Sequence, residues 1–409
     1  MPTRRSAVTA VAGLAATAFG RDAMAQGRDR NIKIGLNLSF TGADAPGAQR
    51  IANGAQMAFD AANRNKTVKG HVFHIEKFDD ATAGRYDPAQ GAANARKMIA
   101  ERAMLAAIGP MLSSVGKAML PIMADGNLPI ISPSATSPDL TDPKFAGDYR
   151  PKGRVVFFRT VTTDAYQGLN MANFYAEVLA VKTVFVLDDG GIFGVGIADS
   201  FEAQAKQKGI QLLGRDRLDP KAADHGAVLA RIRSLGAQSL YYGGITLAGA
   251  TLARQAHDIL PAVIKGSGDG IMGTDFLAAA GFPAVEGWYA TQASPNLVGD
   301  PALAAWTRTY VARFKSPPDN DSITAHSAAE AIVEAARIVA ATGKPVTRDA
   351  LRDALQTVRI KTLQGMVEFD ANGDIKSRTV SIYQIRKDAT KPLDDPAAQF
   401  KFIFTAPGS

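Results

Sequence analysis

Hydroxyl side chains gather where two apolar runs of the sequence end. One run ends in ISPSATSPDLT (131–141), and the other ends in IGPMLSS (108–114), where Ser113 and Ser114 directly precede a helical pattern. Hydroxyls beside the free N–H groups of a helix start form a receptor for a carboxylate that needs no fixed cation. The local alternative is that the serines cap the helix and shape a turn. The sequence leaves both interpretations open.

Other kinds of chemistry find few suitable residues. The chain of 409 residues has no cysteine and five histidines, which removes disulfides and thiol nucleophiles. His71 and His74 lie in one strand-like run, where they face opposite sides and cannot share a metal. The segment GGIFGVG (190–196) lacks the GxGxxG spacing of a dinucleotide site, and no serine has the spacing of a nucleophile elbow. We predict no catalytic residue, no metal and no cofactor, and an enzyme is the less favoured alternative.

The rest of the chain must hold these segments in place. Short β-branched runs alternate with long alanine-rich amphipathic runs, which predicts parallel strands joined by crossover helices. In such sheets, ligands bind beyond the carboxyl ends of the strands, next to helix N-termini. Both hydroxyl-rich segments fall at such ends. The predicted strands are 32–39, 71–80, 104–110 and 128–132 in a first series, and 154–160, 183–189, 239–244 and 262–268 in a second.

Two doubly wound α/β lobes explain the two series better than one very wide sheet, because single cores stop growing near about 250 to 300 residues. The last third of the chain is less regular. Within it, MVEFDANGDIKSRTVSIYQIRK (366–387) is predicted to form an antiparallel hairpin that turns at Asn372-Gly373.

Residues 1–25 are predicted to be an export signal that is cleaved after Ala23-Met24-Ala25. The pair Arg4-Arg5 leaves twin-arginine export open beside general secretion. Cleavage removes three arginines and one aspartate, so the formal charge falls from +7 to +5. The remaining charges are dispersed, without the basic block that nucleic-acid binding favours. We therefore expect a soluble protein of the periplasm that does not bind nucleic acid.

The order and spacing of several segments resemble those of the periplasmic type I substrate-binding proteins of ABC transporters, the leucine/isoleucine/valine-binding branch in particular. The resemblance covers essentially the whole mature chain and implies two α/β lobes joined by three hinge crossovers that close on a ligand. The expected lobes are 31–154 with 289–363, and 155–288 with 364–409. The segments are IKIGLNLSFTGADA (32–45), IGPMLSS, ISPSATSPDLT, FRTVTTDAYQG (158–168), LDDGGIFGVGIADS (187–200), YYGG (241–244) and VEFDANGD (367–374).

The resemblance also implies a ligand site on the two hydroxyl-rich segments. It places the grip on a ligand carboxylate at Ser113, helped by the backbone and by the neighbouring Ser114. A backbone carbonyl for the ligand ammonium falls on Ser134, and Thr136 contacts both charged groups. Ala135, between these two, is included in the expected site.

The second lobe is expected to close over the ligand with residues that depart from the family pattern. Asp269 stands where the branch carries a glutamate facing the ammonium, although a turn residue is the alternative for an aspartate between two glycines. Phe193 replaces a tyrosine and Ile245 an aromatic residue, which makes this wall more apolar. Gly47 replaces an aromatic residue in the first lobe and leaves room. His326 lies near a region that edges the pocket in the family, with a bystander as its alternative.

The resemblance implies that the protein captures an amino acid, branched-chain or otherwise apolar, by hinge closure. Its expected partners are that ligand and an inner-membrane ABC permease with cytoplasmic ATPase subunits, and a monomer is expected. An aromatic carboxylic acid, an amide or a urea-like ligand is the alternative, as is a ligand-sensing subunit. Asp269 favours an amino acid, because a simple carboxylic acid has no cation for a buried aspartate.

Overall fold

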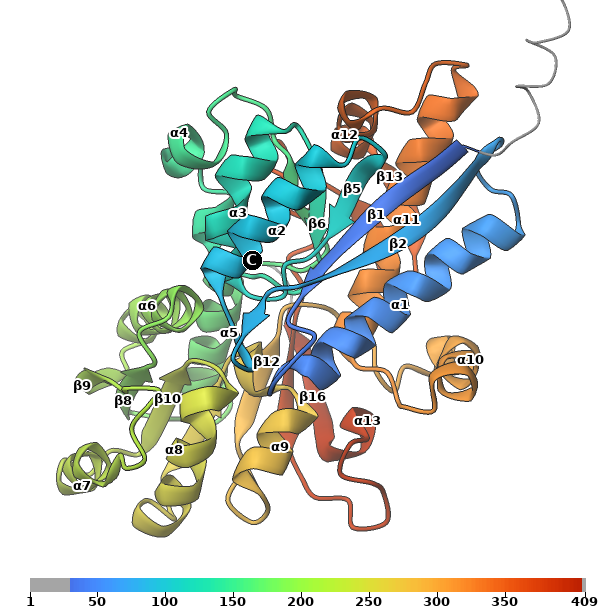
Figure 1. Ribbon diagram of the computed structural model, residues 1–409. Coiled ribbons are helices and arrows are strands. Elements are labelled where there is room, and N and C mark those ends of the chain that lie inside the picture. Colours follow the sequence, from blue (N-terminus) through green and yellow to red (C-terminus); the bar gives the residue numbers. More distant parts are fainter. Residues whose placement is uncertain (1–29, 407–409) are drawn as a thin grey trace, which may run out of the picture.

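Two separate β-sheets divide the protein into two α/β lobes, which lie one above the other in Figure 1. The computed structural model describes residues 30–406, so the expected export signal at 1–25 lies outside the described residues. Strands and helices alternate through most of both lobes, as the sequence pattern predicts. Within residues 30–406, no helix has both the length and the apolar character that crossing a membrane requires.

Lobe one contains a five-stranded sheet in which all neighbouring strands are parallel. In sheet order, the strands are β2 (His71–Asp79), β1 (Arg30–Leu38), β5 (Met104–Ile108), β6 (Ile130–Ser132) and β7 (Phe157–Arg159). The helices that cover it are α1 (Ala45–Arg64), α2 (Pro88–Ala100), α3 (Ser113–Asp125), α11 (Asn320–Ala341) and α12 (Arg348–Thr357). Ile34 and Leu36 pack with α1, α11 and α12, whereas Ala107 and Ile130 pack with α2 and α3. Burial on both faces explains why the central strands β5 and β6 are almost wholly apolar, whereas the edge strand β2 is partly exposed and carries polar residues.

Lobe two contains a seven-stranded sheet. In sheet order, the strands are β16 (Phe400–Ala406), β15 (Val380–Ile385), β12 (Tyr289–Gln292), β11 (Ile264–Ser267), β10 (Ser239–Gly243), β8 (Thr183–Asp188) and β9 (Gln211–Arg217). The strands from β12 to β9 run parallel, and β15 and β16 add an antiparallel edge. The helices are α5 (Asp164–Glu177), α6 (Ile192–Gln207), α7 (Gly226–Ser234), α8 (Thr246–Ile259) and α9 (Thr274–Ala280). Val184 and Val186 face α5 and α6, and Phe185 and Leu187 face α7 and α8.

Three segments cross between the lobes. The first links β7 to α5, the second follows β12, and the third precedes β15. The first two lie side by side, because the Thr162 N–H donates to the Ala293 carbonyl at 2.9 Å. The first also meets the segment that leads into the third, because the Arg159 N–H donates to the Gly373 carbonyl at 3.1 Å. The predicted fold class, two doubly wound lobes joined by three crossovers, is confirmed.

The crossings lie a few residues later than the predicted boundaries. The boundary at 154/155 assigned β7 to lobe two, but β7 pairs with β6 in lobe one. The boundary at 288/289 assigned β12 to lobe one, but β12 pairs with β11 and β15 in lobe two. After the third boundary, at 363/364, Phe369 and Ile375 still pack into the core of lobe one. Hydrogen-bond partners decide which sheet a strand joins, and the composition of the strand does not specify them.

The predicted hairpin over 366–387 is wrong, although its turn is present. Gly373 has a φ of 96°, which favours glycine, and Phe369 and Ile375 form an antiparallel bridge around the turn. The flanking strands part, because β14 (Gly365–Glu368) pairs with β13 (Arg359–Thr362) whereas β15 joins lobe two. The remaining short elements include β3 (Ala81–Thr82), β4 (Arg85–Tyr86), α4 (Ala146–Tyr149), α10 (Ala304–Phe314) and α13 (Pro396–Gln399).

Candidate functional site

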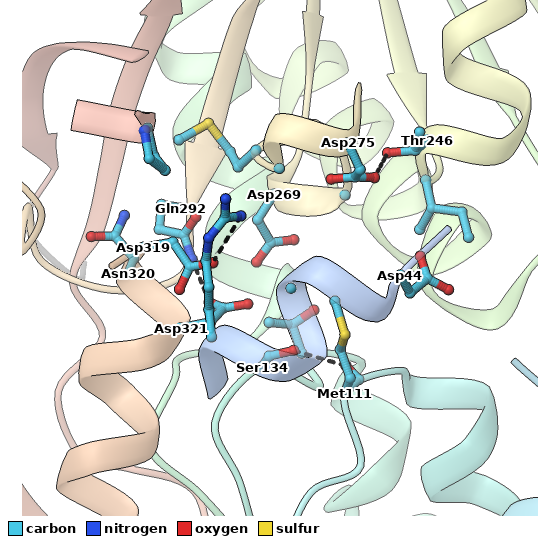
Figure 2. A pocket seen from close by; sticks show the side chains of 18 of the residues that line it. Asp44, Met111, Ser134, Thr246, Asp269, Asp275, Gln292, Asp319, Asn320 and Asp321 are labelled. Carbon is cyan, nitrogen blue, oxygen red and sulfur yellow. Dashed lines mark hydrogen bonds and ion pairs between the residues drawn. The ribbon is translucent and has the colours of Figure 1, made fainter. Parts of the chain in front are cut away.

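A cavity lies between the two lobes, at the carboxyl ends of strands from both sheets (Figure 2). It encloses about 1070 Å³ of empty space, including open solvent at its mouth. We call it the interlobe cavity. Seven predicted ligand-binding residues line it, namely Gly47, Ser113, Ser134, Thr136, Phe193, Ile245 and Asp269.

Three other predicted residues do not line the interlobe cavity. Ser114 follows Ser113 on α3, where one helical step turns its side chain away. Ala135 is buried, and its N–H donates to the Ser132 hydroxyl at 2.8 Å. His326 is five residues beyond the cavity-lining Asp321 on α11, a rotation of roughly 140°. Its ring lies edge-on to a tryptophan side chain away from the cavity, so the bystander interpretation of His326 fits the structure.

Neither serine at the start of α3 caps that helix. The N-cap residue is Leu112, which makes no side-chain capping bond. The Ser113 hydroxyl instead accepts a hydrogen bond from the Ser137 N–H at 3.2 Å. The first N–H groups of α3 therefore lack a side-chain cap, and the helix start borders the interlobe cavity at Leu112 and Ser113. An uncapped helix start attracts anions.

A buried arginine holds the hydroxyl-rich segment after β6. Arg159 is fully buried, and its Nη1 donates to the carbonyls of Ala135 at 3.1 Å and Ser137 at 2.9 Å. Its Nε donates to Asp374 at 2.6 Å, which neutralises the charge. Thr136 lies between the two braced carbonyls, so Arg159 fixes the place of a cavity-lining hydroxyl.

The glycines beside Asp269 are needed for packing. A Cβ at Gly270 would lie 2.3 Å from the Gly244 carbonyl oxygen and 2.7 Å from the Phe193 ring, and real contacts are never so short. Asp269 starts a short 3₁₀ turn, as its alternative predicted, and its side chain also points into the interlobe cavity (Figure 2). Both interpretations of Asp269 therefore agree with the structure.

Several residues of the interlobe cavity were missed in the sequence. Met111 occupies part of the room left by Gly47, since a Cβ on that glycine would meet the Met111 methyl group at 3.1 Å. Charged side chains also line the cavity, namely Asp44, Arg50, Asp275, Asp319 and Asp321. One sequence signal for this group was available: Asp319 and Ser322 form the capping box that starts α11.

The carboxylates of the interlobe cavity sit in a poorly solvated, negatively charged environment. Burial, followed by repulsion from Asp164, raises the pKa of Asp269 well above its usual value. Burial, followed by repulsion from Asp319 and Asp269, raises the pKa of Asp321 in the same way. Burial and Asp275 raise the pKa of Asp44 to about 6. Such a site favours a bound cation over an empty state.

Metal ligation has no cluster to support it in the described part of the chain. Among residues 30–406, no group of three or more histidine, aspartate and glutamate side chains is arranged to hold a metal ion. The imidazoles of His71 and His74 make separate polar contacts, with the Lys69 carbonyl and the Asn31 amide oxygen respectively.

Comparisons with known proteins agree with this architecture. The family described as periplasmic binding protein matches residues 31–390. The Leu/Ile/Val-binding protein BraC3 of Rhizobium johnstonii is 29% identical over 372 residues, which cover 91% of this chain and 96% of that protein. The isoleucine complex of the branched-chain amino acid transporter substrate binding protein LivJ from Streptococcus pneumoniae gives a TM-score of 0.77 at 21% identity, covering 91% of this chain and 99% of that one.

A third similar protein has a different kind of ligand. It is a solute binding protein of an ABC transporter from Rhodopseudomonas palustris, in complex with 3,4-dihydroxybenzoic acid. The TM-score is 0.75 at 16% identity, covering 93% of this chain and 98% of that one. At such low sequence identity these two structures support the fold alone, and the ligand has to be inferred from the residues of the site. Because the family match spans most of the sequence, the chain belongs to the periplasmic binding protein family.

Proposed function

We propose that this protein is the substrate-binding component of an ABC importer and that it captures an amino acid between its lobes. The observation that carries the proposal is the division of charge within the interlobe cavity. Around the start of α3 it is lined by hydroxyls and uncapped N–H groups, whereas aspartates, Asp269 of lobe two among them, line other parts of its wall. This arrangement complements a zwitterion, which presents one anionic and one cationic group.

The carboxylate of the ligand is proposed to bind at the start of α3. Ser113 and Thr136 offer hydroxyls there, and the first N–H groups of α3 offer further donors with a favourable helix dipole. Among the described residues of lobe one, the two nearby arginines are directed to aspartates: Arg159 pairs with Asp374, and Arg50 lies 3.9 Å from Asp319. The carboxylate would therefore be held by neutral donors.

The ammonium of the ligand is proposed to bind between Ser134 and Asp269. The Ser134 hydroxyl donates to the Met111 carbonyl at 2.9 Å, which orients this residue at the cavity wall. Asp269 supplies the opposite charge from lobe two. A charge-assisted hydrogen bond in such a poorly solvated place is stronger than one between neutral groups.

An apolar side chain fits the walls that flank these groups. Phe193, Ile245 and Met111 line the interlobe cavity together, and the names of BraC3 and LivJ refer to branched-chain amino acids. We therefore propose a branched-chain or similar apolar amino acid as the ligand.

Hinge closure is the proposed mechanism of capture. The ligand first binds to lobe one, and closure then brings Phe193, Ile245 and Asp269 over it and expels water. The closed protein is proposed to act as a monomer that delivers its ligand to an inner-membrane permease with cytoplasmic ATPase subunits. Export by the signal at 1–25, through either route, would bring it to the periplasm.

An aromatic carboxylic acid is the second candidate ligand. The dihydroxybenzoate complex from Rhodopseudomonas palustris favours it, together with the apolar wall around Phe193. Asp269 opposes it, because such an acid brings no cation for this carboxylate. The same binding event could serve a sensing subunit instead of transport.

Thermal unfolding of the ligand-free mature protein tests the proposal. The panel contains branched-chain amino acids, their deaminated and decarboxylated analogues, and aromatic acids. A ligand at 100 times its dissociation constant adds about 2.7 kcal/mol of stability. Leucine or a related amino acid should raise the transition temperature, and Asp269→Asn should remove most of that shift. The matched control is Asp258→Asn, at an exposed position on α8. If only aromatic or deaminated acids raise the transition temperature, the ligand is a carboxylic acid without an ammonium group, and amino-acid capture is wrong.

A further inference from the structure

Asp321 is a second carboxylate that faces Asp269 from the opposite lobe (Figure 2). It lies in the first turn of α11 in lobe one, whereas Asp269 follows β11 in lobe two. Its Oδ1 accepts a hydrogen bond from Gln292 Nε2 at 3.2 Å. Gln292 is the last residue of β12, so this bond already joins the lobes beside Asp269.

The cation that lines the interlobe cavity does not neutralise these two carboxylates. In the described chain, Arg50 is the single lysine or arginine among the lining residues. Its Nη1 donates to the Thr274 hydroxyl at 3.0 Å and lies 3.9 Å from Asp319 Oδ2. The charge of Arg50 is therefore directed to Asp319, and within residues 30–406 no other lysine or arginine lines the cavity to neutralise Asp269 and Asp321.

A third carboxylate behind Asp269 makes the deficit of positive charge larger. Asp164 is fully buried, and its Oδ1 accepts a hydrogen bond from Gln167 Nε2 at 3.0 Å, whereas its Oδ2 has no hydrogen-bond partner among residues 30–406. Repulsion from Asp164 acts on Asp269, and repulsion from Asp269 acts on Asp321. Closure therefore gathers like charges from both lobes in a poorly solvated space. That arrangement is costly unless a cation enters it or a proton is taken up.

We propose that Asp269 and Asp321 form a two-lobe carboxylate clamp, in which a primary ammonium of the ligand bridges the lobes. This inference rests on the proposed function and names the ligand group that drives closure. A primary ammonium has three N–H donors. One reaches each carboxylate of the clamp, and the third is left for the Ser134 carbonyl.

The carboxylate clamp is expected to distinguish ligands by their nitrogen group. A deaminated acid leaves both carboxylates without a cation and adds a third negative charge. A quaternary ammonium supplies charge but no N–H donor, so it cannot bridge the two side chains by hydrogen bonds. The preferred ligands are thus primary amines, and α-amino acids satisfy the clamp and the start of α3 together.

Isothermal titration of the mature protein and its variants tests the clamp. The probes are leucine, its decarboxylated amine 3-methylbutylamine, and its deaminated acid 4-methylpentanoate. Asp321→Asn keeps an oxygen that can accept from Gln292, removes the charge and replaces the second acceptor oxygen by an NH2 donor. It should weaken leucine binding by about 10- to 100-fold, the loss expected for a charged hydrogen bond. The control Asp258→Asn, at an exposed position on α8 outside the interlobe cavity, should stay within about 3-fold. Ligand-free unfolding confirms that each variant is folded, and Asp321→Ser replaces Asp321→Asn if it is not.

The possible outcomes separate the clamp from the proposed function. If the unaltered protein binds leucine and Asp321→Asn binds it equally well, the clamp is wrong and amino-acid capture stands. If the amine binds without leucine and Asp321→Asn loses it, the clamp stands and amino-acid capture is wrong. If neither leucine nor the amine binds, both are wrong. Support for both requires leucine binding that depends on Asp321, with 4-methylpentanoate bound at least about 100-fold more weakly.

Discussion

Replacement of Arg159 by methionine should destabilise lobe one and weaken ligand binding at the same time. The guanidinium is fully buried, and it donates to the Asp374 carboxylate at 2.6 Å and to two carbonyls of the segment after β6. Methionine keeps most of the apolar volume and removes every donor. Asp374 then loses its cation, and the carbonyls of Ala135 and Ser137 lose their partner.

The expected loss follows from these contacts. Removal of one partner from a buried ion pair costs about 3 to 5 kcal/mol. Each carbonyl left without a partner costs about 1 to 3 kcal/mol, and such terms do not add fully. The Asp374 side chain is 23% exposed, so water partly solvates its charge and the loss of the ion pair costs less than it would in a fully buried place. We expect Arg159→Met to lower the free energy of unfolding by about 4 kcal/mol.

Arg154→Met is the matched control, because Arg154 also pairs with aspartates but keeps 38% of its side-chain exposure. Surface pairs contribute less than about 1 kcal/mol, so this variant should unfold nearly as the unaltered protein does. Urea unfolding followed by far-ultraviolet circular dichroism measures both, and titration with leucine measures binding. If Arg159→Met loses no more stability than Arg154→Met, the bracing of the hydroxyl-rich segment by Arg159 is wrong.

Two further predictions concern pH and packing. Burial raises the pKa of Asp164 to about 7, so the folded protein holds this proton over a range where the unfolded chain has lost it. The free energy of unfolding, relative to Asp164→Asn, should therefore fall by at most about 4 kcal/mol between about pH 4 and pH 8, and a flat difference would contradict this. Gly54→Ala should lower the free energy of unfolding by more than about 2 kcal/mol, because its Cβ would lie 1.9 Å from the Ser322 carbonyl oxygen. Gly47→Ala should lower it by less than about 1 kcal/mol, because the new Cβ meets only the movable Met111 methyl group. Equal thermal stability of the two glycine variants would refute that contrast.

The hydroxyl-rich segments could be placed in the site from sequence because the relevant rule is local. Parallel strands end at one edge of their sheet, so the residues after β5 and β6 had to meet there. Ser113, Ser134 and Thr136 accordingly line one cavity. Whether these serines cap α3 was not a local matter, because the Ser113 hydroxyl accepts a hydrogen bond from Ser137, which follows a different strand.

The predicted hairpin shows where the same reasoning stops. Asn372-Gly373 encodes a turn through the left-handed conformation of its glycine, and the turn is present. Pairing of the flanking strands depends on partners far along the chain. The strand after the turn pairs with β12 and β16 in lobe two, whereas the strand before it stays in lobe one with β13.

The sequence by itself determined the α/β alternation, the glycines around Asp269 and the hydroxyls of lobe one, because each depends on backbone preferences and periodicity within a short stretch. Only the tertiary structure decided that Asp269 and Asp321 face each other and that Arg50 is directed to Asp319. Such charges look like ordinary surface residues in a linear sequence. They become a site when packing of α1 against α11 and the crossings between lobes bring them together in a space with little water, where unbalanced charge has a high energy.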